Sequence, residues 1–193
     1  MRWLAMLCAI LAWPASAETR LPALNRVTGV AADDVLNVRA GPGVAHGIVG
    51  SLLPDTVVEV TATGGQGGRW GRINLGEGSG WVALRFLSAL PGGTKAPPAS
   101  CFGTEPFWTL DLADHAFRTP EGTMPTDPPV DVPSMNRPDR SGVIVATSQG
   151  SLRGIVRRET CSDGMSDALY GLSIDLFTAD DGAILSGCCT LAR

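Results

Sequence analysis

Histidine is scarce in this chain of 193 residues, which contains only His46 and His115. The nearest approach to a Gly-x-Ser-x-Gly nucleophile elbow is the segment 164–168, whose serine is Ser166. A nucleophilic serine needs an adjacent base, and in an elbow enzyme that base is a histidine later in the chain. No histidine follows Ser166. We therefore expect no catalytic residue of this kind and no enzyme activity.

Long apolar runs are also missing after residue 17, so no segment reaches the roughly 20 apolar residues that a membrane helix needs. The first seventeen residues are different. Arg2 precedes an apolar run from Trp3 to Trp13, which is followed by Pro14 and Ala15-Ser16-Ala17. This order is typical of a secretory signal peptide. We expect cleavage after Ala17 and a periplasmic or secreted mature chain without a membrane span.

The chain has no excess of basic residues, since its formal net charge is -4. After residue 100 there are thirteen acidic and seven basic side chains. Nucleic acid attracts proteins with the opposite charge balance. Nucleic acid is therefore not an expected partner.

A helical stripe of apolar residues is absent as well, whereas short alternating runs are frequent. Such runs predict strands, and Gly- and Pro-rich turns separate them. The segment PGGTKAPPAS, within residues 91–100, has the composition of a linker. We expect an all-β chain with a small N-terminal domain at 26–90 and a second β domain at 101–193. The six prolines between Pro120 and Pro138 favour an exposed loop there.

The segment LNVRAGPG, residues 36–43, is followed by Trp70, Ile73, the triplet Gly80-Trp81-Val82 and Leu87. This order resembles the bacterial SH3 domain family over about residues 26–90. The resemblance implies a small barrel, and strand alternation gives its expected interior. These interior positions are Leu36, Val38, Val58, Val60, Ile73 and Val82.

Binding rather than chemistry is what this resemblance implies, because domains of the family are often envelope modules that dock on peptidoglycan or on peptides. A groove would lie near Asn37, Arg39, Trp70 and Trp81, where aromatic faces and a cation could hold an extended peptide or a sugar. The alternative is that both tryptophans pack the barrel and its rim, and that Arg39 is a solvated strand residue. The partner that we expect is peptidoglycan or an envelope protein.

The second half contains EPFW, the pattern Cys-x-Asp-x-Met-Ser and a Gly-Cys near its end. It is similar to a family of bacterial envelope proteins that often are lipoproteins, and this resemblance transfers no activity. Cys8 lies inside the apolar run behind the bulky Leu7, so this chain lacks a lipidation cysteine. We expect it to be free in the periplasm.

Four cysteines remain after the signal peptide, and an even number in an exported chain predicts disulfides. In a strand from Ile184 to Leu191, Cys188 and Cys189 point to opposite faces and cannot pair with each other. Two connectivities remain open. We favour Cys101–Cys189 with Cys161–Cys188. The alternative, a metal site of cysteines with His115, lacks Cys-x-x-Cys spacing, so we expect neither metal nor cofactor.

Two further functions are compatible with the acidic second half. It could inhibit a basic hydrolase such as lysozyme, since opposite charge steers association. A weak glycan hydrolase could use two of the carboxylates Glu105, Asp163 and Asp167. For Asp163 and Asp167 the simpler interpretation is a turn held by local hydrogen bonds to the backbone.

Overall fold

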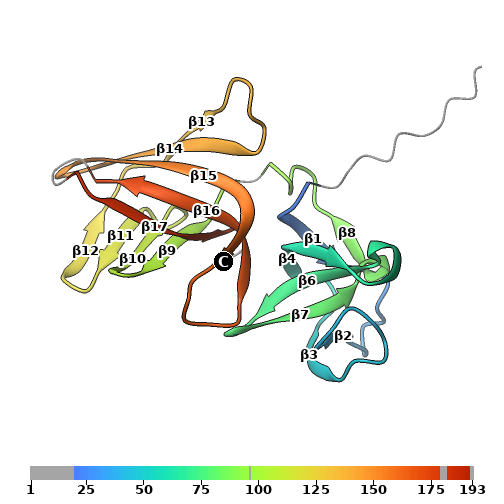
Figure 1. The fold of residues 1–193 in the computed structure, drawn as a ribbon. Coiled ribbons are helices and arrows are strands. Elements are labelled where there is room, and N and C mark those ends of the chain that lie inside the picture. Colours follow the sequence, from blue (N-terminus) through green and yellow to red (C-terminus); the bar gives the residue numbers. More distant parts are fainter. Residues whose placement is uncertain (1–19, 96, 179–181, 192–193) are drawn as a thin grey trace, which may run out of the picture.

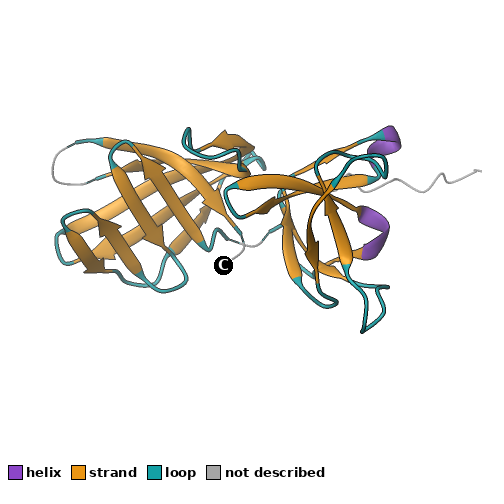
Figure 2. Ribbon diagram, turned by 90° about the horizontal axis from the view of Figure 1, so that it is seen from below, coloured by secondary structure: helices purple, strands orange, loops and turns teal. Residues whose placement is uncertain are grey.

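The computed structural model describes residues 20–95, 97–178 and 182–191, and it contains two β domains side by side (Figure 1). The predicted signal peptide lies outside the described residues. In the described part the helical segments are two single turns of 3-10 helix, Gln66–Gly68 and Leu84–Phe86. The predicted all-β fold class is confirmed (Figure 2). None of the described helical segments has the length and apolarity that a membrane span requires.

The N-terminal domain consists of two small sheets, with strand orders β4-β1-β8 and β3-β2-β7-β6-β5. All six predicted interior residues are buried in one cluster, which Val27 completes. They are Val and Ile side chains, with Leu36, on short strands. Most of these strands alternate between core and surface, whereas Val58, Glu59 and Val60 are all buried in theirs. The strands are β1 Ala23–Val27, β2 Leu36–Arg39, β3 Ile48–Leu52, β4 Val57–Val60, β5 Ala62–Gly64, β6 Trp70–Leu75, β7 Gly78–Ala83 and β8 Leu87–Ala89.

The C-terminal domain is one nine-stranded antiparallel sheet that curls around its own core. A bridge between Thr126 and Thr147 brings the segment after β12 against β14, so the curl nearly closes. Its order is β12-β11-β10-β9-β17-β16-β15-β14-β13. The strands are β9 Ser100–Thr104, β10 Phe107–Asp111, β11 Ala116–Thr119, β12 Gly122–Pro125, β13 Val130–Pro133, β14 Arg140–Thr147, β15 Gly150–Ser162, β16 Leu169–Phe177 and β17 Ile184–Thr190.

The expected loop between Pro120 and Pro138 is the main error of the sequence analysis, because this segment contains β12 and β13. Both strands end in a proline, Pro125 and Pro133, and they stand at the two ends of the strand order. A proline that lacks an N–H is tolerated on an edge strand, where one side needs no ladder hydrogen bond. Proline content therefore identified edge strands and not a loop.

The structure forms the disulfides Cys101–Cys189 and Cys161–Cys188, which is the connectivity that the sequence favoured. Cys101 and Cys189 are cross-strand partners on β9 and β17, with 4.0 Å between their Cα atoms, and both belong to the buried core. Cys161 lies on the opposite face and reaches Cys188 over a Cα separation of 5.6 Å.

The two domains are joined by more than a linker. Leu191 N donates to Glu59 Oε2 at 2.9 Å, and the Thr190 hydroxyl donates to the same oxygen, which brings the buried Glu59 of β4 against the end of β17. Leu169 N lies 3.2 Å from Asn74 Oδ1, and Asp167 N donates to the Glu77 carbonyl at 2.9 Å. These contacts dock the C-terminal sheet on the β6–β7 hairpin.

Candidate functional site

The turn after β2 is held by short-range contacts from its own loop. Ala40 N donates to the Gly47 carbonyl at 2.9 Å, and Arg39 Nη1 donates to the His46 carbonyl at 2.7 Å. A Cβ added to Gly41 would lie 2.5 Å from His46 Nδ1, so only glycine leaves room for this imidazole. Arg39 therefore stabilises the loop that carries Pro42.

Trp81 lies on the face of β7 that points away from the core, opposite Arg39 of β2 and Arg72 of β6. Its ring packs against the backbone of Gly64, where an added Cβ would be 2.6 Å from the ring. Trp81 is half-buried by this contact. The structure thus gives Trp81 a packing role beneath β5 and Pro42.

Trp70 is the predicted residue that borders an open hollow. Gly65 adopts φ +73° beside it, and an added Cβ there would lie 2.8 Å from Trp70 Cδ1 and 2.7 Å from the Pro42 carbonyl oxygen. The hollow measures about 420 Å³ and is bordered also by Val44 and Arg69. We call it the Trp70 hollow, and its lining residues are Pro42, Gly43, Val44, Gln66, Arg69, Trp70, Ala83, Leu84 and Arg85.

Two arginines give the Trp70 hollow a positive rim. Arg69 Nε donates to the Gln66 carbonyl at 3.2 Å, which fixes this side chain across the 3-10 turn. The Arg85 guanidinium lies 4.7 Å from the centre of the Phe86 ring, at a cation–π distance. The hollow therefore combines an indole, a proline and two cations, which suits a ligand with both an apolar or sugar face and a negative group.

The four predicted binding residues share the outer face of the domain without sharing one site. Trp70 and Trp81 are diagonal neighbours across the β6–β7 pair, and Arg39 is opposite Trp81. Asn37 is exposed, two residues before Arg39 on the same face of β2. Of the four, Trp70 alone borders the hollow. The sequence analysis missed Arg69 and Arg85, although Pro42 stands in the Gly-Pro-Gly turn that it had singled out.

Of the three carboxylates proposed for glycan hydrolysis, Asp163 is held by backbone N–H groups. Asp163 Oδ1 accepts hydrogen bonds from Met165 N and Ser166 N at 3.0 and 2.9 Å, and the Ser166 hydroxyl donates to Oδ2 at 2.8 Å. Burial raises the pKa of Asp163, but these hydrogen bonds outweigh it and hold the pKa below its ordinary value. Glu105 and Asp167 are exposed. A general acid needs a raised pKa, so Asp163 suits a turn better than that role.

A polar groove on the outer face of the C-terminal sheet was also missed. Arg157 Nη1 contacts Asp175 Oδ2 at 2.6 Å, and the Ser186 hydroxyl donates to Asp175 Oδ1 at 2.7 Å. The hydrogen bonds from Ser186 and from Arg157 lower the pKa of Asp175. Asp175 of β16 is the cross-strand partner of Ser186 of β17, and Arg157 of β15 is its diagonal neighbour. Only cross-strand register, which the sequence does not give, brings them together.

Comparison with known proteins identifies the family of the N-terminal domain. No curated protein matches the chain. The family model of the bacterial SH3 domain matches residues 34–88, which include β2 to β7, the Gly-Pro-Gly turn and every residue that lines the hollow. This part of the chain is a bacterial SH3 domain.

Proposed function

We propose that the protein is an exported binding protein of the cell envelope, and that its SH3 domain docks on peptidoglycan or on a peptide through the Trp70 hollow. The observation that carries this proposal is the position of Trp70, half-buried beside Pro42 and open to a concave surface. An indole whose edge is fixed by Gly65 offers a rigid face for a sugar ring or an apolar side chain.

The positive rim supports the same ligand class. Arg69 and Arg85 both line the hollow, in a protein whose net charge is negative. Peptide stems and free chain ends carry carboxylates, and guanidinium groups bind carboxylates in pairs of parallel hydrogen bonds. The residues that line the hollow therefore suit the binding of such a ligand, and this role needs no catalytic group.

The two alternative functions have less support. An acidic inhibitor would act through its carboxylates, and three of those in the C-terminal domain, Asp111, Asp139 and Asp175, are in ion pairs with arginines of the same domain. A glycan hydrolase would need a carboxyl group of raised pKa, and Asp163 has the opposite shift.

Co-sedimentation with purified peptidoglycan sacculi tests the proposal, using the whole mature protein because the two domains are docked. We expect the wild type to be retained and Trp70→Ala to bind at least about tenfold more weakly, as is common for a central aromatic residue of a binding site. Phe107→Ala is the matched control, because this exposed aromatic side chain lies in the other domain. Its retention should equal that of the wild type.

Arg85→Gln provides a second variant, since the exposed Arg85 can be changed with little risk to folding. It should weaken retention and make it less sensitive to salt. Equal retention of the wild type, Trp70→Ala and Arg85→Gln would show that the Trp70 hollow is not the site. Failure of the wild type to sediment would contradict peptidoglycan as the ligand.

A further inference from the structure

A separate cavity lies where the linker passes the β13–β14 hairpin, and its volume is about 270 Å³. We call it the junction cavity. One wall is the linker around Thr94 and Lys95, and another is the hairpin segment 133–141. Arg158 of β15 forms a third side, while the floor is apolar, with Val156 and Leu172. Three distant parts of the chain therefore converge on one hollow, which does not overlap the Trp70 hollow.

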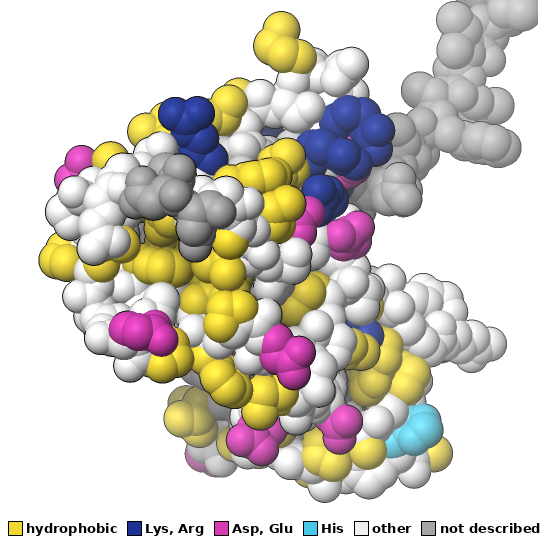
Figure 3. All heavy atoms as spheres, turned by 60° about the vertical axis from the view of Figure 1, so that its left-hand side comes forward, with side chains coloured by type: hydrophobic (Ala, Val, Ile, Leu, Met, Phe, Trp, Pro, Cys, Tyr) yellow, Lys and Arg dark blue, Asp and Glu magenta, His cyan; other side chains and the backbone are white. Residues whose placement is uncertain are grey.

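Positive charge is concentrated in the junction cavity. One carboxylate lines it, that of Asp131, whereas the protein as a whole has a net charge of -4. Figure 3 shows several Lys and Arg side chains gathered together at the upper right of the molecule. The cationic residues that line the cavity are Arg20, Lys95, Arg137, Arg140 and Arg158.

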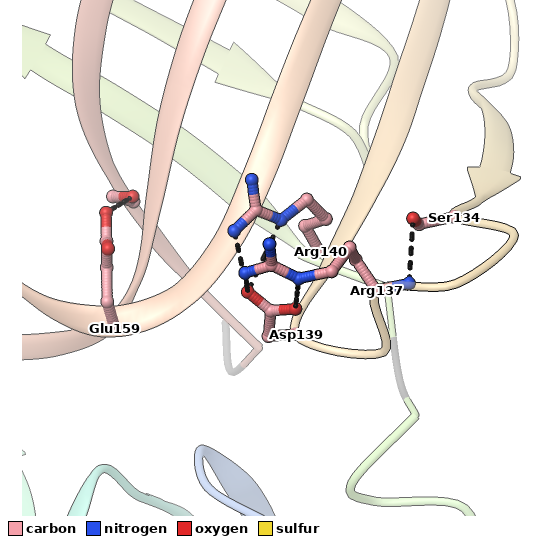
Figure 4. Close-up of polar contacts among 6 residues, drawn as sticks. Ser134, Arg137, Asp139, Arg140 and Glu159 are labelled. Carbon is pink, nitrogen blue, oxygen red and sulfur yellow. Dashed lines mark hydrogen bonds and ion pairs between the residues drawn. The ribbon is translucent and has the colours of Figure 1, made fainter.

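Two of these cations share one carboxylate (Figure 4). Arg137 Nε lies 3.1 Å from Asp139 Oδ1, and Arg140 Nη2 lies 2.8 Å from Asp139 Oδ2. The Ser134 hydroxyl oxygen accepts a hydrogen bond from Arg137 N at 3.2 Å, which fixes the turn that carries the pair. Two guanidinium groups on one carboxylate leave one positive charge in excess, and the shared Asp139 orients both.

Arg158 is a third cation, and both of its hydrogen bonds go to backbone carbonyl oxygens. Nη1 donates to the Pro22 carbonyl at 2.9 Å, and Nη2 donates to the Thr94 carbonyl. Carbonyl oxygens orient a guanidinium group but do not neutralise it. Burial lowers the pKa of Arg158 and the charge of Arg20 lowers it further, while the carboxylate of Glu59 acts in the opposite direction without cancelling them.

We propose that the junction cavity binds a phosphate group carried by a small anionic molecule or headgroup. A phosphate monoester has a charge of about -1.5 to -2 near neutral pH, which fits an excess of positive charge better than one carboxylate does. The planar guanidinium group of arginine can donate two parallel hydrogen bonds to two phosphate oxygens. Four of the five cations that line the cavity are arginines. Prolines 97, 98, 133 and 138 border the cavity and would contact the carbon skeleton next to the phosphate.

Calorimetric titration of the mature protein with pyrophosphate, in a phosphate-free buffer, tests this site. We expect saturable binding, and we expect the double variant Arg137→Gln/Arg140→Gln to bind at least about tenfold more weakly, since it loses two charge-assisted contacts. Arg153→Gln is the control, because Arg153 is an exposed arginine of the same sheet that does not line the cavity. It should bind like the wild type.

Succinate and lipid vesicles extend the titration. Succinate should bind more weakly than pyrophosphate, and equal affinity would overturn the choice of phosphate. Vesicles of phosphatidylglycerol are compared with vesicles of phosphatidylcholine. If the wild type binds the phosphatidylglycerol vesicles and the double variant does not, the source of the phosphate is a lipid headgroup. If neither kind of vesicle binds, the source is a soluble phosphate ester. Absence of saturable pyrophosphate binding, or equal binding by the double variant, would overturn the proposal. Sacculus retention depends on the other hollow, so the two proposals can fail separately.

Discussion

The two domains are both built from antiparallel strands, but they are stabilised differently. The SH3 domain packs a small group of Val, Ile and Leu side chains between short strands. The C-terminal domain uses long strands, a larger core with Trp108 and Phe117, and two disulfides. Its long strands carry the pairs that form its polar groove, whereas the open hollow of the SH3 domain is made by turns.

This difference bears on where ligands bind. In the SH3 domain Pro42 and Trp70 border a hollow that is made by loops and the ends of strands, and such segments can vary without disturbing a core. The junction cavity depends instead on contact between the domains, because Arg158 of one domain hydrogen-bonds to Pro22 and to Thr94. Docking thus creates a surface that neither domain has alone.

The largest effect in this comparison should come from the core disulfide. Replacing Cys101 and Cys189 by alanine removes a crosslink over 88 residues, and we expect the free energy of unfolding to fall by about 4 kcal/mol. Alanine is chosen instead of serine because it places no hydroxyl group in the core. Urea unfolding followed by tryptophan fluorescence measures the loss.

The same pair of substitutions at Cys161 and Cys188 is the matched control, since that crosslink spans 27 residues. A shorter loop restricts the unfolded chain less, so the expected loss is smaller, about 3 kcal/mol. A larger loss at Cys161–Cys188 than at Cys101–Cys189 would contradict the expectation that the crosslink over the longer loop contributes more stability.

A smaller effect is expected at the contact between the domains. Glu59→Ala removes the acceptor of Leu191 N and of the Thr190 hydroxyl, and hydrogen bonds to a charged group contribute about 1.5–3 kcal/mol. We expect a loss of about 2 kcal/mol and a calorimetric transition that splits into two. Glu77→Ala is the control, because it keeps the backbone carbonyl that binds Asp167 N. A single transition in Glu59→Ala would show that the domains are coupled by other contacts.

Local alternation made much of the fold predictable. The interior of the SH3 domain follows from the alternation of side chains along each strand, and its six predicted members are buried. The same rule excluded a bridge between Cys188 and Cys189 and left two connectivities, of which the structure has the favoured one. The strands β12 and β13 were missed because each is defined by pairing with one adjacent strand, which the sequence does not show. Their prolines also indicated a loop.

The sites were less predictable than the fold. Trp70 was found from the resemblance, but Arg69 and Arg85 carry no pattern of their own and become neighbours only when β6 and β7 pair. Arg137, Arg140 and Arg158 lie in the acidic half of the chain. The negative net charge of that half gave no indication of a cationic site. Charge totals describe a segment, whereas a binding site depends on which few charges the fold brings together.

The smallest expected effect is the dependence of stability on pH through Asp175. Hydrogen bonds from Ser186 and Arg157 lower its pKa in the folded state, so its stabilising effect is present above the unfolded value of about 3.8 and is lost as pH falls through the folded pKa. A partly exposed ion pair contributes less than about 1 kcal/mol. We expect Asp175→Asn to be less stable than the wild type by urea unfolding at neutral pH, and this difference to shrink in acid. The exposed Asp33→Asn in the SH3 domain should show a smaller difference. A deficit of Asp175→Asn that persisted unchanged in acid would indicate that packing, and not its charge, explains the contribution of Asp175.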